Sequence, residues 1–119
     1  MAHLVALITD REIAAELTAA AEAAGHDVDV CTDEADAWDA CEERTQALVV
    51  DLSSDSIDGA TLVDSMRAGG ELRTVRVLAF HGDADFAAKA RAAEVGFDVV
   101  VPRSQMQASG ARLIAALLA

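Results

Sequence analysis

The feature that most constrains this sequence is a regular alternation between short apolar runs and longer segments with helical spacing. The apolar runs are His3 to Ile8, Val28 to Cys31, Ala47 to Val50, Val75 to Phe80 and Val99 to Val101. Three of them lack polar alternation, which is typical of strands covered on both faces. Between the runs, apolar residues recur every three or four positions, as they do on one face of a helix. We therefore predict five strands that alternate with five helices.

The ends of the predicted helices carry recognisable signals. Gly25 is placed to end the first helix and Gly96 to end the fourth, since glycine is the usual residue just past a helix. Ser104 and Gln107 have the spacing of a capping box at the start of the last helix. These boundaries leave short connections, as expected for one compact unit.

Strands and helices that alternate in this way imply a parallel sheet with helices on both faces. Right-handed crossovers leave few topologies, and the compact choice is the flavodoxin-like (βα)5 fold, a doubly wound five-stranded parallel sheet in the order 2-1-3-4-5. We predict that residues 1–119 form one such α/β domain. In this order the first and third strands are neighbours where ligands bind, and Asp51 and Asp10 follow these two strands.

The charge balance excludes some classes of partner. Nine Lys and Arg face 21 Asp and Glu, which gives a formal net charge of −12. Such a field repels phosphate backbones and anionic lipid, so we expect neither nucleic acid nor membrane as a partner. Residues 27–43 hold eight acids and no Lys or Arg, and form either a solvated face or, less often, a docking patch for a basic partner.

Two cysteines, Cys31 and Cys41, are too few for a disulfide framework, and no secretory signal precedes the first strand. No apolar run approaches the roughly 18 residues of a membrane helix. We therefore expect a cytoplasmic protein.

Three further spacings carry a family resemblance. Asp51 stands eight residues before Gly59, Asp58-Gly59 heads the third helix, and Gly96 stands seven residues before Arg103. In order and spacing the chain resembles the receiver (CheY-like) domain of bacterial response regulators over nearly its whole length. The resemblance implies a signalling domain of two-component systems in which an aspartate accepts a phosphoryl group from a histidine kinase. It also implies a Mg²⁺ ion held by that aspartate and by an acidic pair after the first strand.

Asp51 falls on the phosphoacceptor position, but the acidic pair falls on Ile8 and Thr9. Only Asp10, one position later, is charged there, so Asp10 and Asp51 could form at most a weak Mg²⁺ site. The alternative, to which we give more weight, is that Thr9 or Asp10 caps the first helix. No other cofactor is expected.

The remaining positions of the family's site are also altered. The switch hydroxyl falls on His81, the lysine on Arg103 and the switch aromatic on Val100. If protonated, His81 could donate to a docked phosphoryl group or form an ion pair with Asp51; if neutral, it could fill the pocket beside Asp51. The alternative is a partly exposed histidine at a strand end. Arg103 could neutralise Asp51 directly, which we favour, or lie over the acidic surface. The other histidines, His3 among them, are expected at the surface.

Two functional hypotheses follow from these residues. The first is an atypical receiver that serves as a protein-interaction module, with Asp51 kept in a degraded phosphoryl site. The second is a phosphorylation-competent receiver that uses Asp51 with Asp10 and Arg103. A lesser alternative is an anti-sigma-factor antagonist (STAS-like) domain, which "DLSSDSIDG" resembles. The chemistry would be at most phosphoacceptor or autophosphatase chemistry at Asp51, so we do not expect an enzyme.

The expected partners are proteins, either a histidine kinase or a downstream signalling protein, and the expected state is a monomer or a weak homodimer. In the resembling family, the usual contact surface is formed by the fourth helix, the fifth strand and the fifth helix. Here that surface would include Phe86, Lys89, Val100 and Met106.

Overall fold

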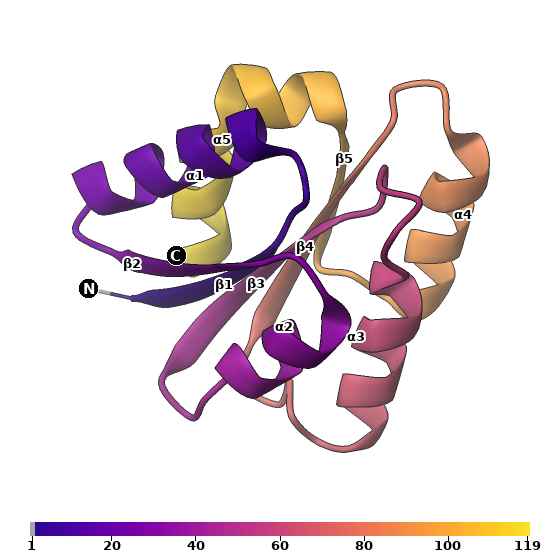
Figure 1. Ribbon diagram of the computed structural model, residues 1–119, viewed down its shortest axis with the longest axis horizontal. Helices are drawn as coiled ribbons and strands as arrows, with labels where there is room; N and C mark the ends of the chain where they lie inside the picture. The colour runs from indigo at the N-terminus through magenta and orange to yellow at the C-terminus, as the bar shows by residue number, and fades with distance from the viewer. Residues whose placement is uncertain (1) are drawn as a thin grey trace.

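The computed structural model describes residues 2–119 and shows a five-stranded, fully parallel sheet in the order β2-β1-β3-β4-β5 (Figure 1). The strands are β1 His3–Leu7, β2 Asp27–Cys31, β3 Thr45–Asp51, β4 Arg76–His81 and β5 Val99–Pro102. The helices are α1 Arg11–Ala23, α2 Glu34–Ala40, α3 Gly59–Ala68, α4 Phe86–Val95 and α5 Arg103–Leu118. The predicted flavodoxin-like fold is confirmed.

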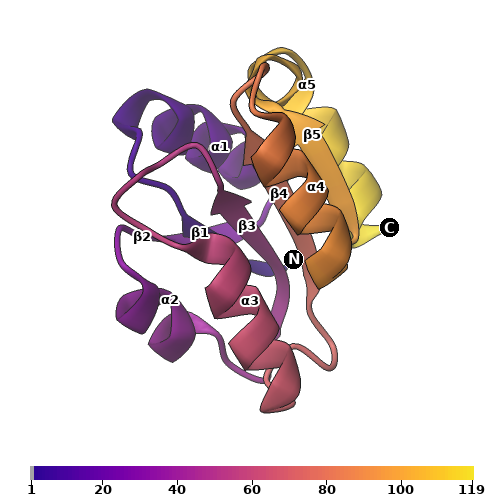
Figure 2. The same ribbon diagram turned by 90° about the vertical axis from the view of Figure 1, so that its right-hand side faces the viewer.

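Helices cover both faces of the sheet, as the unbroken apolar strands require. Helices α1 and α5 lie together on one face, while α2, α3 and α4 lie on the other (Figures 1 and 2). Ile13, Leu17 and Ile114 fill the first layer against the sheet, and Val63 and Met66 fill the second. No helix within residues 2–119 is both long and apolar enough to cross a membrane.

The central strand β3 is longer than its apolar run and ends on the carboxylate itself. It pairs with β1 on one side and β4 on the other, and Asp51 is its last residue, opposite Phe80. Because all five strands are parallel, their carboxyl ends meet at one edge, and Asp51 stands in the middle of that edge. Asp51 therefore belongs to the strand, whereas the sequence placed it just beyond.

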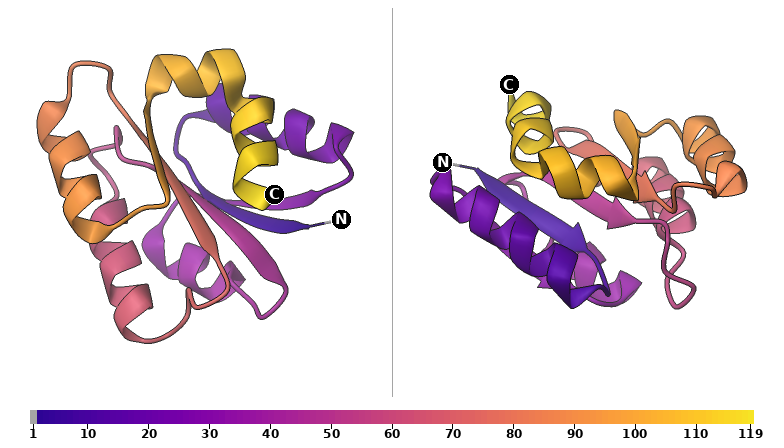
Figure 3. Two further views of the ribbon diagram at one scale, coloured as in Figure 1. Left: turned by 180° about the vertical axis from the view of Figure 1, so that it is seen from behind. Right: turned by 90° about the horizontal axis from the view of Figure 1, so that it is seen from above.

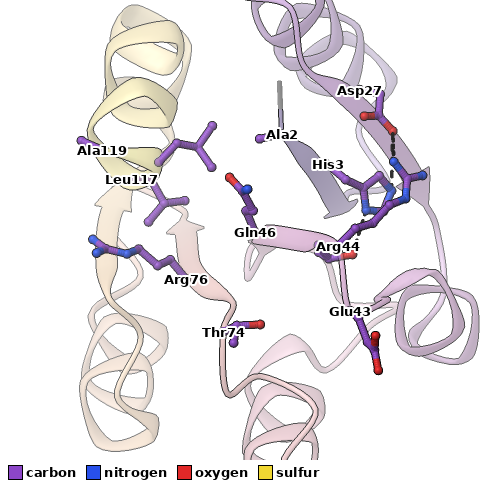
Figure 4. A pocket seen from close by; sticks show the side chains of 12 residues that line it. Ala2, His3, Asp27, Glu43, Arg44, Gln46, Thr74, Arg76, Leu117 and Ala119 are labelled. Atoms are coloured by element: carbon purple, nitrogen blue, oxygen red, sulfur yellow. Dashed lines mark hydrogen bonds and ion pairs between the residues drawn. The ribbon is translucent and has the colours of Figure 1, made fainter.

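The opposite edge holds a polar network that the sequence did not reveal. His3 is 2% exposed; its Nδ1 lies 2.7 Å from Oγ1 of Thr45 and its Nε2 lies 2.8 Å from Oδ2 of Asp29. The expectation that His3 is a surface residue is wrong, because the side chain joins Thr45, at the start of β3, to Asp29 within β2. A cavity of about 670 Å³ opens beside it, with Arg44 and Arg76 also in its wall (Figure 4).

Helix α5 differs from the prediction in two ways. The expected capping box of Ser104 and Gln107 is wrong: the helix begins at Arg103, with Pro102 at the N-cap and no side-chain cap bond. In addition, Ser109 has non-helical angles (φ −135°, ψ 24°), and the helix bends there (Figure 3).

Gly59 opens α3 at the point where the helix packs closest to β3. A β-carbon added at Gly59 would overlap Cγ1 of Val50. We predict that Gly59→Ala lowers the free energy of unfolding in urea by about 1–3 kcal/mol, because a core side chain must shift. Gly110→Ala is the matched control, since its β-carbon would meet nothing nearer than Cε of Met106 at 3.9 Å. Equal stability of the two variants would contradict this packing argument.

Candidate functional site

Asp51 is buried at the carboxyl edge of the sheet, and its carboxylate is turned onto its own loop. It is 1% exposed, and its Oδ1 accepts the backbone N–H of Ser53 at 2.8 Å as well as the Ser53 hydroxyl. A carboxylate that accepts the amide two residues on forms an Asx turn, which helps the chain leave the strand. The residue predicted to fall on the phosphoacceptor position therefore also forms a turn.

Asp10 caps helix α1. Its Oδ1 accepts the backbone N–H of Glu12 at 2.9 Å and that of Ile13 at 3.2 Å, which satisfies two free amides of the first turn. The capping alternative is thus confirmed, and Asp10 is the N-cap. The bond from Ile13 is the main cause that lowers the pKa of Asp10, with Arg103 acting in the same direction.

Arg103 contacts the site in a different way from the one favoured above. Its guanidinium forms an ion pair with Oδ2 of Asp10 and donates to the Ser53 hydroxyl at 3.2 Å. No ion pair joins Arg103 to Asp51 in the part of the chain that the structure describes, so the favoured direct pair is wrong. The cation reaches Asp51 through Ser53 instead. The result is a continuous polar chain from Asp10 through Arg103 and Ser53 to Asp51.

His81 lies beside this chain but does not pair with Asp51. It is 4% exposed, and its Nδ1–H donates to the carbonyl oxygen of Gly82 at 2.8 Å. Its Nε2 is buried and has no hydrogen-bond partner among residues 2–119. Two of the expectations for His81, the ion pair with Asp51 and the partly exposed histidine, are wrong. Asp51 is in register with Phe80, the residue before His81. Because successive residues of a strand point to opposite faces, His81 points to the other face of the sheet from Phe80, and this accounts for the missing pair with Asp51.

Asp83 is a site residue that the sequence reading missed. Its Oδ1 accepts the backbone N–H of Ser104 at 3.0 Å, and its hydrogen bonds to Ser104 are the main cause that lowers its pKa. The bond supplies from another loop the cap that α5 lacks. No local sequence pattern indicates this hydrogen bond, because Asp83 and Ser104 come together only in the folded protein. The role of Ser53 could have been found, since its spacing from Asp51 is that of an Asx turn.

The carboxylates present do not fit a Mg²⁺ ion in this arrangement. Mg²⁺ prefers octahedral oxygen ligands, usually one or two carboxylates with several waters. Both oxygens of Asp10 and Oδ1 of Asp51 already have protein partners. Asp55 is exposed in a turn. Within residues 2–119, no group of three or more His, Cys, Asp or Glu is placed to hold a metal ion.

Comparisons with known proteins agree with this architecture. No family model matches the sequence, and no curated protein is similar to it. Among solved structures, a putative response regulator from Chloroflexus aurantiacus is 23% identical (TM-score 0.81, covering 98% of this chain and 97% of that chain). The chemotaxis response regulator CheY4 of Vibrio cholerae is 17% identical (TM-score 0.84, covering 99% of each chain).

A third solved structure is of interest for its site. A response regulator from Burkholderia pseudomallei, with a phosphorylated aspartic acid, calcium ion and citrate, is 20% identical (TM-score 0.80, covering 100% of this chain and 67% of that chain). These likenesses show that the chain has the fold of a CheY-like receiver domain.

The lowered pKa values of Asp10 and Asp83 predict an acid-sensitive fold. A carboxyl whose pKa is lower in the folded state stabilises the protein above its unfolded value, near 3.8, and this stability is lost as the pH falls through the folded value. We predict that Asp10→Asn, which keeps a capping side chain, is less stable at pH 7. Its urea midpoint should also fall less steeply below about pH 5.

The control for this measurement is Asp55→Asn, since Asp55 is an exposed turn residue. It should follow the pH profile of the unsubstituted protein. An Asp10→Asn profile that keeps the full acid slope would show that the Asp10 pair does not contribute to it.

Proposed function

We propose that this chain is an atypical receiver that acts as a protein-interaction module in two-component-type signal transduction, without phosphorylation of Asp51. The observation that carries the proposal is the polar chain from Asp10 through Arg103 and Ser53 to Asp51. Its one cation, Arg103, is already paired with Asp10 and hydrogen-bonded to the serine that donates to Asp51. A receiver site that works by phosphorylation needs those same carboxylates free for a metal ion and an incoming phosphoryl group.

The energetic argument concerns what a metal ion would have to displace. To bind Mg²⁺, Asp10 would have to give up Arg103 or the amides that cap α1. A partly buried charge that loses its partner is strongly destabilising. Arg103 therefore does by itself what the metal does in a phosphorylated receiver, which is to place positive charge beside the carboxylates.

The switch residues support the same proposal. His81 stands at the position of the switch hydroxyl, but it is buried and its Nδ1–H is already used by Gly82. At the position of the switch aromatic, Val100 has no ring to move. These two residues lack the groups that couple a phosphoryl group to the surface in the resembling family.

The second candidate is a phosphorylation-competent receiver. It is favoured by Asp51 at the acceptor position and by the nearby cation of Arg103, which is connected to Asp51 through the Ser53 hydroxyl. The Burkholderia pseudomallei structure contains a phosphorylated aspartic acid on the same fold. In this case Arg103 would move from Asp10 to the phosphoryl group, and Asp10 would be released.

The proposed contact surface lies on α4 and β5. Phe86 is 74% exposed at the start of α4, and Lys89, the only lysine of the chain, is exposed one turn later. Val100 on β5 is partly buried. Met106 does not belong to this surface: it is 4% exposed and packs in the core, so its assignment to the face was wrong. The surface suits a protein with an apolar recess edged by acidic groups.

The absence of a phosphorylation requirement can be tested directly. We predict no mass shift after incubation with Mg²⁺ and acetyl phosphate, and no Mg²⁺-dependent binding of beryllofluoride. The reason is that Asp10, which would have to bind the metal ion, already forms an ion pair with Arg103. Mass spectrometry and ¹⁹F NMR would measure these outcomes. A mass shift that disappears in Asp51→Asn would establish the second candidate instead.

The contact surface gives a separate prediction. Lys89→Glu should reduce the recovery of bound partner proteins in pull-downs from the source organism by at least about fivefold, since reversal of a rim charge repels an acidic partner. Arg76→Glu is the matched control, because Arg76 is exposed at the opposite edge of the sheet and has no ion-pair partner among the described residues. Equal losses in both variants would mean a general charge effect, and no loss would place the contact surface elsewhere.

A further inference from the structure

Helix α5 is built as two limbs with different supports. The non-helical angles at Ser109 separate residues 103–108, here called the arm, from residues 110–118, here called the stem. The arm runs along the carboxyl edge of the sheet, and the stem turns away from it toward the C-terminus (Figure 3, left). Gly110 follows the break directly, and a β-carbon there would meet only Cε of Met106, at 3.9 Å.

The first turn of the arm is bound to three separate loops of the site. Arg103 reaches Asp10 after β1 and Ser53 after β3, and the backbone N–H of Ser104 donates to Asp83 after β4. Every polar group that links α5 to the candidate site therefore lies in the two residues that begin the arm. The position of the arm depends on the state of these contacts.

The rest of the arm has little else to hold it. Met106 is its one buried side chain, whereas the stem places Ile114 and Leu117 in the core. A helix of about six residues is only marginally stable without such packing. A groove of about 550 Å³ between α1 and the junction, lined by Glu16 and Ala20, leaves room beside the bend.

From this arrangement we infer that the arm is a latched segment: Arg103 holds it onto the site, and release of Arg103 lets it move about Ser109 and Gly110 while the stem stays in place. The inference rests on the proposed function, because it makes the state of that site the regulator of the arm. It supplies a route from the site to the surface that does not need an aromatic residue at position 100. Any group that competes for Asp10, whether a cation or a partner's side chain, would free the arm.

Hydrogen exchange of the full chain, followed by mass spectrometry, tests the latch without any phosphodonor. In Arg103→Gln, the amides of residues 103–108 should exchange about tenfold faster, because the arm opens more often. The amides of residues 114–118, whose helical acceptors are carbonyls of the stem itself, should keep their rates. Unchanged exchange in the arm, or an equal rise in both limbs at unchanged global stability, would overturn the inference.

Two further variants make the outcome decisive. Arg112→Gln on the stem is the matched control: this exposed arginine lines the same groove and has no ion-pair partner among residues 2–119, so neither limb should change. If Arg103→Gln lowers global stability so far that both limbs exchange together, Asp83→Ala decides, because it removes the oxygen that accepts the Ser104 N–H and leaves Arg103 in place. Faster exchange confined to the arm supports the latch, and any other pattern overturns it.

The two proposals can fail separately. A negative exchange result removes the latch and leaves the phosphorylation-independent module standing. Phosphorylation of Asp51 would remove that module and leave the exchange result as a property of α5.

Discussion

The ion pair between Asp10 and Arg103 is the interaction on which the rest of the site depends. Asp10 is fixed because its other oxygen caps α1, and Arg103 is fixed because it begins the arm of α5. The pair therefore joins two helices that start from opposite sides of the crevice above β1 and β3. Through Ser53 the same guanidinium determines the surroundings of Asp51. One cation thus links three strand ends that in the sequence lie far apart.

The burial of Asp51 explains why this cation matters more than one in an ordinary surface pair. An isolated exposed ion pair contributes little, because water and salt screen it. Here the carboxylate of Asp51 is buried, and burial without a nearby donor or cation would be costly. Ser53 provides the donor and Arg103 the cation behind it. The acidic surface elsewhere can then remain solvated, since the buried acid is compensated locally.

The sequence predicted the fold well because the relevant signals are local. Apolar runs and helical spacing reveal strands and helices one at a time, and the capping geometry of Asp10 involves only its next three residues. The failures all concern partners that the fold brings together: Asp29 for His3, Asp10 for Arg103 and Asp83 for the start of α5. The ion pair predicted between His81 and Asp51 was wrong for a related reason: a shift of one residue along β4 decides which face of the sheet a side chain meets. Met106 was assigned to the surface because a bend at Ser109 cannot be read from helical periodicity.

Asp51 ends a strand, and its carboxylate both forms the turn after β3 and stands at the carboxyl edge of the sheet. The two roles need different properties of the side chain. The turn after β3 needs only an oxygen that accepts the amide of Ser53, and an asparagine would supply one equally well. The charge is needed for a different reason: the Ser53 hydroxyl donates to Asp51 while it accepts from Arg103, so it carries the polarisation of the cation to the buried acid. An aspartate at position 51 is therefore explained by the arginine at position 103, and this holds whether or not a phosphoryl group is ever attached.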